Sequence, residues 1–214
     1  MNISAPPLKA REPGNPKFAR DAWLRALANT AKIGERNETL PIVIERLAAR
    51  FGDAPALTDP QTEMSFDGLA RRANQYARLG VSLGLLPGDA AALMMNNSAE
   101  YVAVWLGLTR IGVVVALVNS QLSGDALLHS IKVANPKAVI AGADLAARVA
   151  SIRGKLPQGV ACFVHGASAE DFTPLAPLLA ALPGEAMPLA ECAPPPLDAM
   201  ALYIYTSGDR KSVV

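Results

Sequence analysis

The chain has 214 residues, of which 51% are hydrophobic and 18% charged, so it has enough apolar material for a buried core and is neither disordered nor collagen-like. Its 20 basic and 19 acidic residues leave a net charge of +1, so we expect no nucleic-acid partner. Two cysteines, Cys162 and Cys192, are too few for a disulfide framework and lack the spacing of metal ligands.

The first 17 residues are polar, contain four prolines and are expected to form a flexible tail. They lack the continuous apolar stretch of a secretory signal, so we expect a cytoplasmic chain. Residues 18–31 predict an amphipathic helix with Leu24 and Leu27 on one face. Trp23 beside basic residues is compatible with binding at a membrane surface, while packing of this helix on its own domain is the interpretation we favour.

From Leu40 onward, amphipathic or apolar helical segments alternate with short apolar runs. The runs that predict strands are 56–58, 90–95, 113–118, 138–141, 160–164 and 200–205. The segments that predict helices are 40–51, 66–77, 98–110, 126–134 and 145–152. This alternation predicts an α/β fold, with a mainly parallel sheet covered by helices on both faces.

Several residues mark where these helices begin and end. Gly52 follows the helix 40–51 at the position of a left-handed cap, and Ser65 is expected to cap the helix that begins at Phe66. Asn97 and Glu100 have the spacing of a capping box for the next helix.

Two further stretches have distinctive composition. Arg71, Arg72, Gln75 and Arg78 fall opposite the apolar stripe of their helix and are expected to form a solvated face. Residues 173–198 hold seven of the 17 prolines and are expected to form a loop that crosses the domain.

The stretch from Tyr101 to Val118 has nearly the length of a membrane span, but Arg110 interrupts it. An arginine at the centre of a spanning helix costs about 2.5 to 3.5 kcal/mol on insertion scales. The second half of the stretch is rich in valine, which favours strands. We therefore predict a buried helix followed by a buried strand.

Several common catalytic and binding motifs are absent from the sequence. No two glycines are two residues apart, which excludes a dinucleotide-binding G-x-G-x-x-G fingerprint, and there is no G-x-x-x-x-G-K-[ST] loop. His129 lies between residues expected in the core and is interpreted as a structural histidine. We give little weight to catalysis by His165, and we expect Cys162 to be a buried small apolar residue of a strand.

The strand 200–205 runs into Thr206, Ser207 and Gly208. In open parallel sheets, ligands bind beyond the carboxyl ends of the strands. A small hydroxylated turn there presents N–H groups and hydroxyls to a phosphate, and glycine permits close approach. Taken alone, such a tripeptide is more often an ordinary turn.

Longer motifs change that interpretation. Residues 203–208, YIYTSG, resemble the start of the phosphate-binding loop of AMP-forming acyl-CoA synthetases, the adenylate-forming superfamily. Residues 51–57, FGDAPAL, resemble the opening segment of that family, and residues 86–89, LPGD, resemble the turn before its next strand. The run from Asn97 to Ser130 is particularly similar to the fatty-acid transport protein branch, the long- and very-long-chain acyl-CoA synthetases.

The resemblance implies that residues 18–214 form part of an N-terminal AMP-binding domain. It implies a ligase that joins a fatty acid to coenzyme A by way of an acyl-adenylate, with ATP and Mg²⁺ required by the full-length family. Only Thr206, Ser207 and Gly208 match phosphate-binding positions of the family, and the resemblance assigns no catalytic or metal-binding residue to this chain. Peripheral association with the inner face of the membrane is a further expectation.

After Gly208 the sequence departs from the family pattern. Asp209 and Arg210 replace two threonines, Lys211 replaces a glycine, and the sequence ends at Val214. Asp209 would place a negative charge beside a polyphosphate. We therefore expect a truncated or frameshifted reading frame, an inactive chain, and an exposed edge at the strand 200–205. The alternative is a non-catalytic α/β binding or interaction module that keeps the synthetase scaffold.

Overall fold

A computed structural model gives the fold for residues 20–28, 38–59 and 62–205. The chain divides into two units, residues 1–38 and 39–214. In the first unit, residues 20–28 form a helix, which lies inside the predicted helix 18–31. The predicted tail 1–17 lies outside the described residues.

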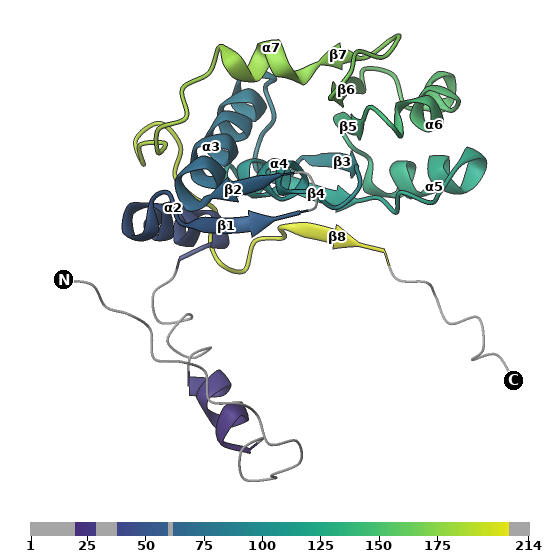
Figure 1. Ribbon diagram of the computed structural model, residues 1–214. Coiled ribbons are helices and arrows are strands. Elements are labelled where there is room, and N and C mark those ends of the chain that lie inside the picture. Colours follow the sequence, from purple (N-terminus) through teal and green to yellow (C-terminus); the bar gives the residue numbers. More distant parts are fainter. Residues whose placement is uncertain (1–19, 29–37, 60–61, 206–214) are drawn as a thin grey trace, which may run out of the picture. The chain divides into compact units, whose positions relative to one another are not determined.

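The second unit is built on a six-stranded sheet (Figure 1). In spatial order its strands are β7 (Thr173–Pro174), β6 (Ala161–His165), β5 (Ala138–Gly142), β3 (Ala90–Met94), β4 (Val114–Leu117) and β8 (Leu202–Ile204). Every neighbouring pair is parallel, which confirms the predicted parallel sheet. A separate antiparallel hairpin joins β1 (Pro55–Thr58) to β2 (Glu63–Ser65), and the sequence had predicted only the first of these two strands.

The helices follow the predicted alternation. They are α2 (Leu40–Phe51), α3 (Phe66–Ser82), α4 (Ala99–Arg110), α5 (Gly124–Ala134), α6 (Ala146–Ala150) and α7 (Leu175–Ala180), with a 3₁₀ turn at Arg153–Lys155. The prediction of a loop over residues 173–198 is wrong at its start, where β7 and α7 form. α7 buries Leu175 and Leu179, and its Pro177 lies in the first turn, where a missing N–H costs no intrahelical bond.

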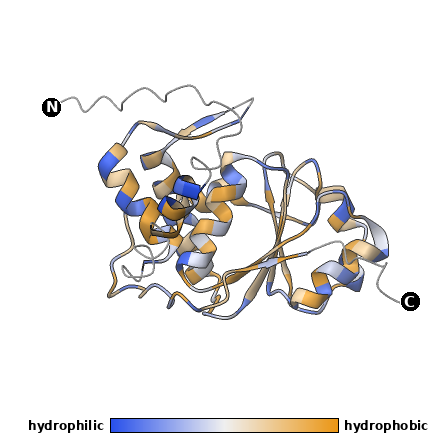
Figure 2. Ribbon diagram, turned by 90° about the horizontal axis from the view of Figure 1, so that it is seen from below, coloured by the Kyte–Doolittle hydropathy of each residue, from blue (hydrophilic) through white to orange (hydrophobic). Residues whose placement is uncertain are grey.

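Helices cover both faces of the sheet, as predicted. Ala91 and Leu93 of β3 belong to a core cluster with residues of α3 and α4, whereas Ala92 and Met94 belong to a second cluster with residues of α5 and α6. Side chains alternate in this way because successive residues of a strand point to opposite faces. The strands are therefore apolar on both sides, and most of their length is coloured hydrophobic in Figure 2.

The predicted cap residues of two helices are confirmed. Gly52 ends α2 with φ at 50°, a conformation that favours glycine, and its N–H donates to the carbonyl of Ala48 at 2.8 Å. Ser65 begins α3, and its Oγ accepts a hydrogen bond from the N–H of Gly68 at 3.0 Å.

The apolar stretch from Tyr101 to Val118 forms most of α4 and then β4, as predicted. Within the described ranges, no helix is long and apolar enough to cross a membrane. α4 instead packs closely against α3, and Gly107 makes this approach possible. A Cβ atom at Gly107 would overlap the carbonyl oxygen of Ala73 and the Cβ of Tyr76.

The predicted solvated face of α3 is wrong for Gln75 and Arg78, which residues 179–191 cover, whereas Arg71 is exposed as predicted. Gln75 donates to the carbonyls of Leu179 and Leu182, both at 3.1 Å. Arg78 donates to the carbonyls of Pro183 at 3.1 Å and Glu185 at 2.7 Å. Carbonyl groups at the end of α7 and in the segment after it thus find donors on α3.

Arg71 and Arg78 add ion pairs to this contact. Arg71 pairs with Glu185 at 3.3 Å, and Arg78 pairs with Glu191 at 3.5 Å. The Arg78 side chain is only 11% exposed, whereas that of Arg71 is 51% exposed. Arg78 is therefore the main anchor that α3 provides.

Arg110, at the end of α4, holds the same segment further along the chain. Its side chain is 1% exposed and donates to the carbonyls of Cys192 at 3.0 Å and Met187 at 3.1 Å. Its Nε lies 3.6 Å from Oε1 of Glu45 on α2. Burial raises the pKa of the Glu45 carboxyl, and the attraction of Arg110 opposes this rise.

We expect Gly107→Ala to destabilise the protein by about 1 to 3 kcal/mol, because the new methyl group forces α3 and α4 apart. Gly154→Ala is the matched control, since a Cβ atom at Gly154 meets no heavy atom within 4 Å. Urea unfolding of both variants measures the difference. Equal stability of the two would contradict the close approach of α3 and α4.

We expect Arg110→Met to destabilise the protein by about 3 to 5 kcal/mol, because two carbonyls lose their hydrogen-bond donor and the carboxylate of Glu45 loses its ion-pair partner. Glu45→Gln is expected to cost much less, since it removes a partly buried charge and leaves both carbonyl contacts intact. The same unfolding measurement compares them. An equal loss in both variants would show that the carbonyl contacts contribute nothing.

Candidate functional site

The carboxyl ends of the parallel strands meet at one edge of the sheet, where ligands of open α/β sheets bind. β8 lies beside β4 here, with Ile204 opposite Leu117. The next residue, Tyr205, donates from its Oη to the carbonyl of Ser130 on α5 at 2.7 Å. The structure thus describes the chain up to the predicted phosphate loop.

Thr206, Ser207 and Gly208 follow directly and lie outside the described residues. Their predicted role in phosphate binding stays a prediction. Burial raises the pKa of the Tyr205 phenol, so its hydroxyl remains a hydrogen-bond donor at neutral pH. The contact with α5 fixes the point from which the three residues continue.

β8 is also the last strand on its side of the described sheet, which agrees with the predicted exposed edge. Ile204 is 69% exposed and Tyr203 39%. Edge strands with exposed apolar side chains favour association with other strands.

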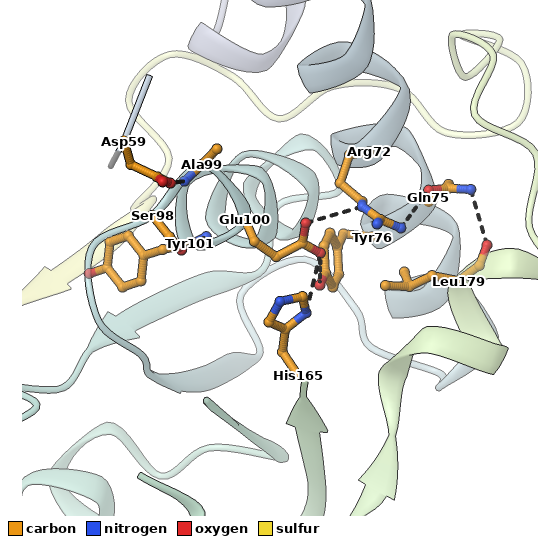
Figure 3. Close-up of polar contacts among 10 residues, drawn as sticks. All are labelled: Asp59, Arg72, Gln75, Tyr76, Ser98, Ala99, Glu100, Tyr101, His165 and Leu179. Carbon is orange, nitrogen blue, oxygen red and sulfur yellow. Dashed lines mark hydrogen bonds and ion pairs between the residues drawn. The ribbon is translucent and has the colours of Figure 1, made fainter. Parts of the chain in front are cut away.

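A buried polar cluster lies near the same edge of the sheet, and we call it the Glu100 cluster: Arg72, Tyr76, Glu100 and His165. Figure 3 shows the Glu100 carboxylate between side chains from α3 and β6. Oε1 of Glu100 accepts a hydrogen bond from Tyr76 Oη at 2.6 Å and lies 3.6 Å from Nδ1 of His165. Oε2 lies 3.2 Å from Nε of Arg72.

The predicted capping box of α4 is wrong. The N-cap is Ser98, whose Oγ accepts a hydrogen bond from the N–H of Tyr101 at 3.1 Å. Asp59 supplies a second acceptor, with its Oδ2 3.4 Å from the N–H of Ala99. Glu100 is therefore free of a capping role and points to α3 and β6 instead.

The charge of Glu100 is balanced within its cluster. Arg72 supplies the opposite charge and also donates to Oε1 of Gln75 at 3.1 Å. Burial raises the pKa of Tyr76 and the negative charge of Glu100 raises it further, so Tyr76 stays protonated and donates. This arrangement stabilises a buried carboxylate and ties α3, α4 and β6 together.

The structure corrects the prediction for one of the two histidines. His129 is exposed on α5, so its interpretation as a core histidine is wrong. His165 contacts Glu100, and its side chain is 37% exposed. Cys162 is buried as predicted, and this burial raises the pKa of its thiol.

A cavity of about 550 Å³ lies at the opposite, amino edge of the sheet. Asp89, Lys137 and Tyr203 are among the residues that line it, and Lys137 pairs with Asp89 at 2.9 Å. This ion pair lowers the pKa of the Asp89 carboxyl. The cavity is separate from the carboxyl edge, where the predicted phosphate loop begins.

No cluster of three or more His, Cys, Asp or Glu side chains that could hold a metal ion occurs among residues 20–28, 38–59 and 62–205.

Comparison with known proteins shows which family has this sequence pattern. The model of the family described as "AMP-binding enzyme" matches residues 44–208. Long-chain fatty acid transport protein 1 of Rattus norvegicus is 34% identical over 198 residues, which are 89% of this chain and 30% of that protein. Medium/long-chain-fatty-acid–CoA ligase FadD6 of Mycobacterium tuberculosis is 26% identical over 166 residues, which are 78% of this chain and 26% of that protein.

The fold is likewise similar to that of a solved structure, the anthranilate CoA ligase AuaEII in complex with anthranoyl-AMP. The TM-score is 0.73 at 22% sequence identity, over 80% of this chain and 33% of that one. This likeness shows the α/β fold. The chain spans about a third or less of the length of each of these proteins.

We expect Tyr76→Phe to destabilise the protein by about 1 to 3 kcal/mol, because the buried Glu100 carboxylate loses its shortest hydrogen bond. Tyr203→Phe changes an exposed tyrosine and is expected to have little effect. Thermal and urea unfolding test this comparison. If both variants are as stable as the unmodified protein, Tyr76 does not stabilise the Glu100 cluster.

Proposed function

Because the chain belongs to the family of AMP-binding enzymes, we propose that it is the N-terminal part of a long-chain fatty-acid–CoA ligase. The observation that carries this proposal is the family match, which runs through β8 and ends at Gly208. The names of the rat and mycobacterial relatives support a fatty acid as the substrate class.

The proposed reaction has two steps. A carboxylate oxygen of the fatty acid attacks the α-phosphorus of ATP, so that pyrophosphate leaves and an acyl-adenylate forms. The thiol sulfur of coenzyme A then attacks the acyl carbon, AMP leaves and the thiol proton is released. Positioning of the reactants and stabilisation of negative charge on the phosphates supply most of the catalysis in such phosphoryl chemistry.

In this proposal Thr206, Ser207 and Gly208 bind ATP phosphates through backbone N–H groups and hydroxyls. β8 and the Tyr205–Ser130 contact support the start of this loop. We assign no step to Mg²⁺, since the described residues offer no metal site. Coenzyme A is the proposed acyl acceptor, and peripheral association with a membrane is part of the proposal because fatty acids partition into lipid.

The matched part of the chain covers 30% of the rat relative, so we propose that the 214 residues do not complete the reaction alone. Asp209 supports this view, because its charge repels a polyphosphate. The same departure from the family pattern favours the second candidate, a binding or interaction module without ligase chemistry.

A ligation assay tests the first proposal. We expect the 214-residue chain to form no acyl-CoA from ATP, a long-chain fatty acid and coenzyme A above the level without enzyme. A fusion of residues 1–208 to the remainder of the rat relative is expected to form acyl-CoA. Ser207→Ala in that fusion is expected to lower the rate about tenfold or more, because one phosphate ligand is lost.

Ser168→Ala is the matched control for the fusion, since Ser168 is exposed and distant in sequence from the loop. Turnover by the 214-residue chain would contradict its proposed inactivity. A folded fusion without activity would contradict the ligase proposal. Sequencing the transcript through the Gly208 codon separates the two candidates: a frame that continues with Thr-Thr-Gly supports the ligase, and a stop after Val214 supports the module.

A further inference from the structure

The helix formed by residues 20–28 presents large apolar side chains to its surroundings. Trp23 is 66% exposed, Leu24 52% and Leu27 50%. Successive residues of a helix are rotated by about 100°, so these three side chains lie within one arc of roughly 100°. The helix thus has one distinct apolar face.

One of the two arginines of this helix, Arg20, lies on this face. Arg20 precedes Leu24 by four residues and Leu27 by seven, which places it on the same side of the helix. Arg25 lies about 100° beyond Leu24 around the helix, on the side opposite the middle of the apolar arc. A partner for this face must therefore accept both apolar side chains and positive charge.

The charge of the whole chain is unevenly distributed. Residues 1–38 contain seven basic and four acidic residues, a net charge of +3, whereas residues 39–214 contain 13 and 15, a net charge of −2. These two values account for the overall charge of +1. The segment around the helix is therefore attracted to anionic surfaces.

An apolar protein groove is a poor match for this face, because it would bury the charge of Arg20. A lipid surface accepts both kinds of side chain: leucines enter the acyl region, tryptophan prefers the interface, and arginine extends toward headgroup phosphates. We propose that residues 20–28 bind an anionic membrane surface, with the helix lying in the plane of the interface. This inference develops the membrane association proposed above and does not depend on ligase chemistry.

Vesicle binding tests the proposal in the full chain, without ATP or coenzyme A, so that its outcome is independent of ligase activity. Vesicles of phosphatidylcholine alone are compared with vesicles that also contain phosphatidylserine. We expect cosedimentation to be about tenfold or more stronger with phosphatidylserine, because Arg20 and the net positive charge of residues 1–38 are attracted to its headgroup. Leu24→Ala combined with Leu27→Ala is expected to weaken binding by about tenfold or more, because apolar area leaves the lipid.

The matched control changes Val133 and Leu189 to alanine, since these are exposed apolar residues of the other unit. This control is expected to bind vesicles like the unmodified chain. The chain has two tryptophans, and Trp105→Phe leaves only Trp23. The fluorescence emission of Trp23 is expected to shift to the blue only when anionic vesicles are added.

Three results would overturn the proposal. They are equal binding to both kinds of vesicle, binding that survives the loss of Leu24 and Leu27, and a Trp23 emission that is already blue-shifted without lipid. The last result would show that the helix packs on protein. Cosedimentation of the chain with Trp105 intact keeps the test valid if the Phe variant does not fold.

Discussion

The buried guanidinium of Arg110 is the contact on which the arrangement of the second unit depends. β8 is the next strand after β7 along the chain, but the two strands form opposite edges of the sheet. The chain between them therefore passes across the helical layer of α3 and α4 before it reaches β4, a course that Figure 1 shows from α7 to β8. Arg110 holds this passage at Met187 and Cys192 and connects it to Glu45 of α2. The position of the edge strand β8 thus depends on an arginine far from it in sequence.

The Glu100 cluster makes a comparable connection at the opposite end of α4 from Arg110. It joins α3, α4 and the end of β6 through one carboxylate, and each of its contacts requires the helices to be docked already. A buried carboxylate stabilises a fold little by itself, but it is costly to leave unpaired, so it favours one arrangement of the three elements over others. The cluster therefore helps to set the geometry of the carboxyl edge.

The sequence predicted the features that depend on local pattern. The period of apolar residues located β3, β4, β5 and β6, and the cap residues Gly52 and Ser65 marked helix ends, because these signals act within a few residues. It failed where a side chain meets a distant partner. Arg78 was expected in solvent because its partners are carbonyl groups of residues 183 and 185, which have no sequence signature. Glu100 had the spacing of a capping box, and only the folded structure shows that Tyr76 and Arg72 bind it. The place of Thr206, Ser207 and Gly208 beyond a parallel strand is compatible with phosphate binding, and only the family resemblance favours that role over an ordinary turn.

The hydrogen bonds that hold residues 179–192 against α3 and α4 also bear on the entropy that the chain loses when β8 pairs with β4. Pairing β8 with β4 joins residues that are far apart in sequence, and the closure of such a loop is unfavourable. The contacts of Gln75, Arg78 and Arg110 divide this closure into short intervals, first at Leu179 and Leu182, then at Pro183 and Glu185, and then at Met187 and Cys192. Each interval between anchors contains only a few residues, so in the folded state little of the chain between α7 and β8 is held by the pairing of β8 alone.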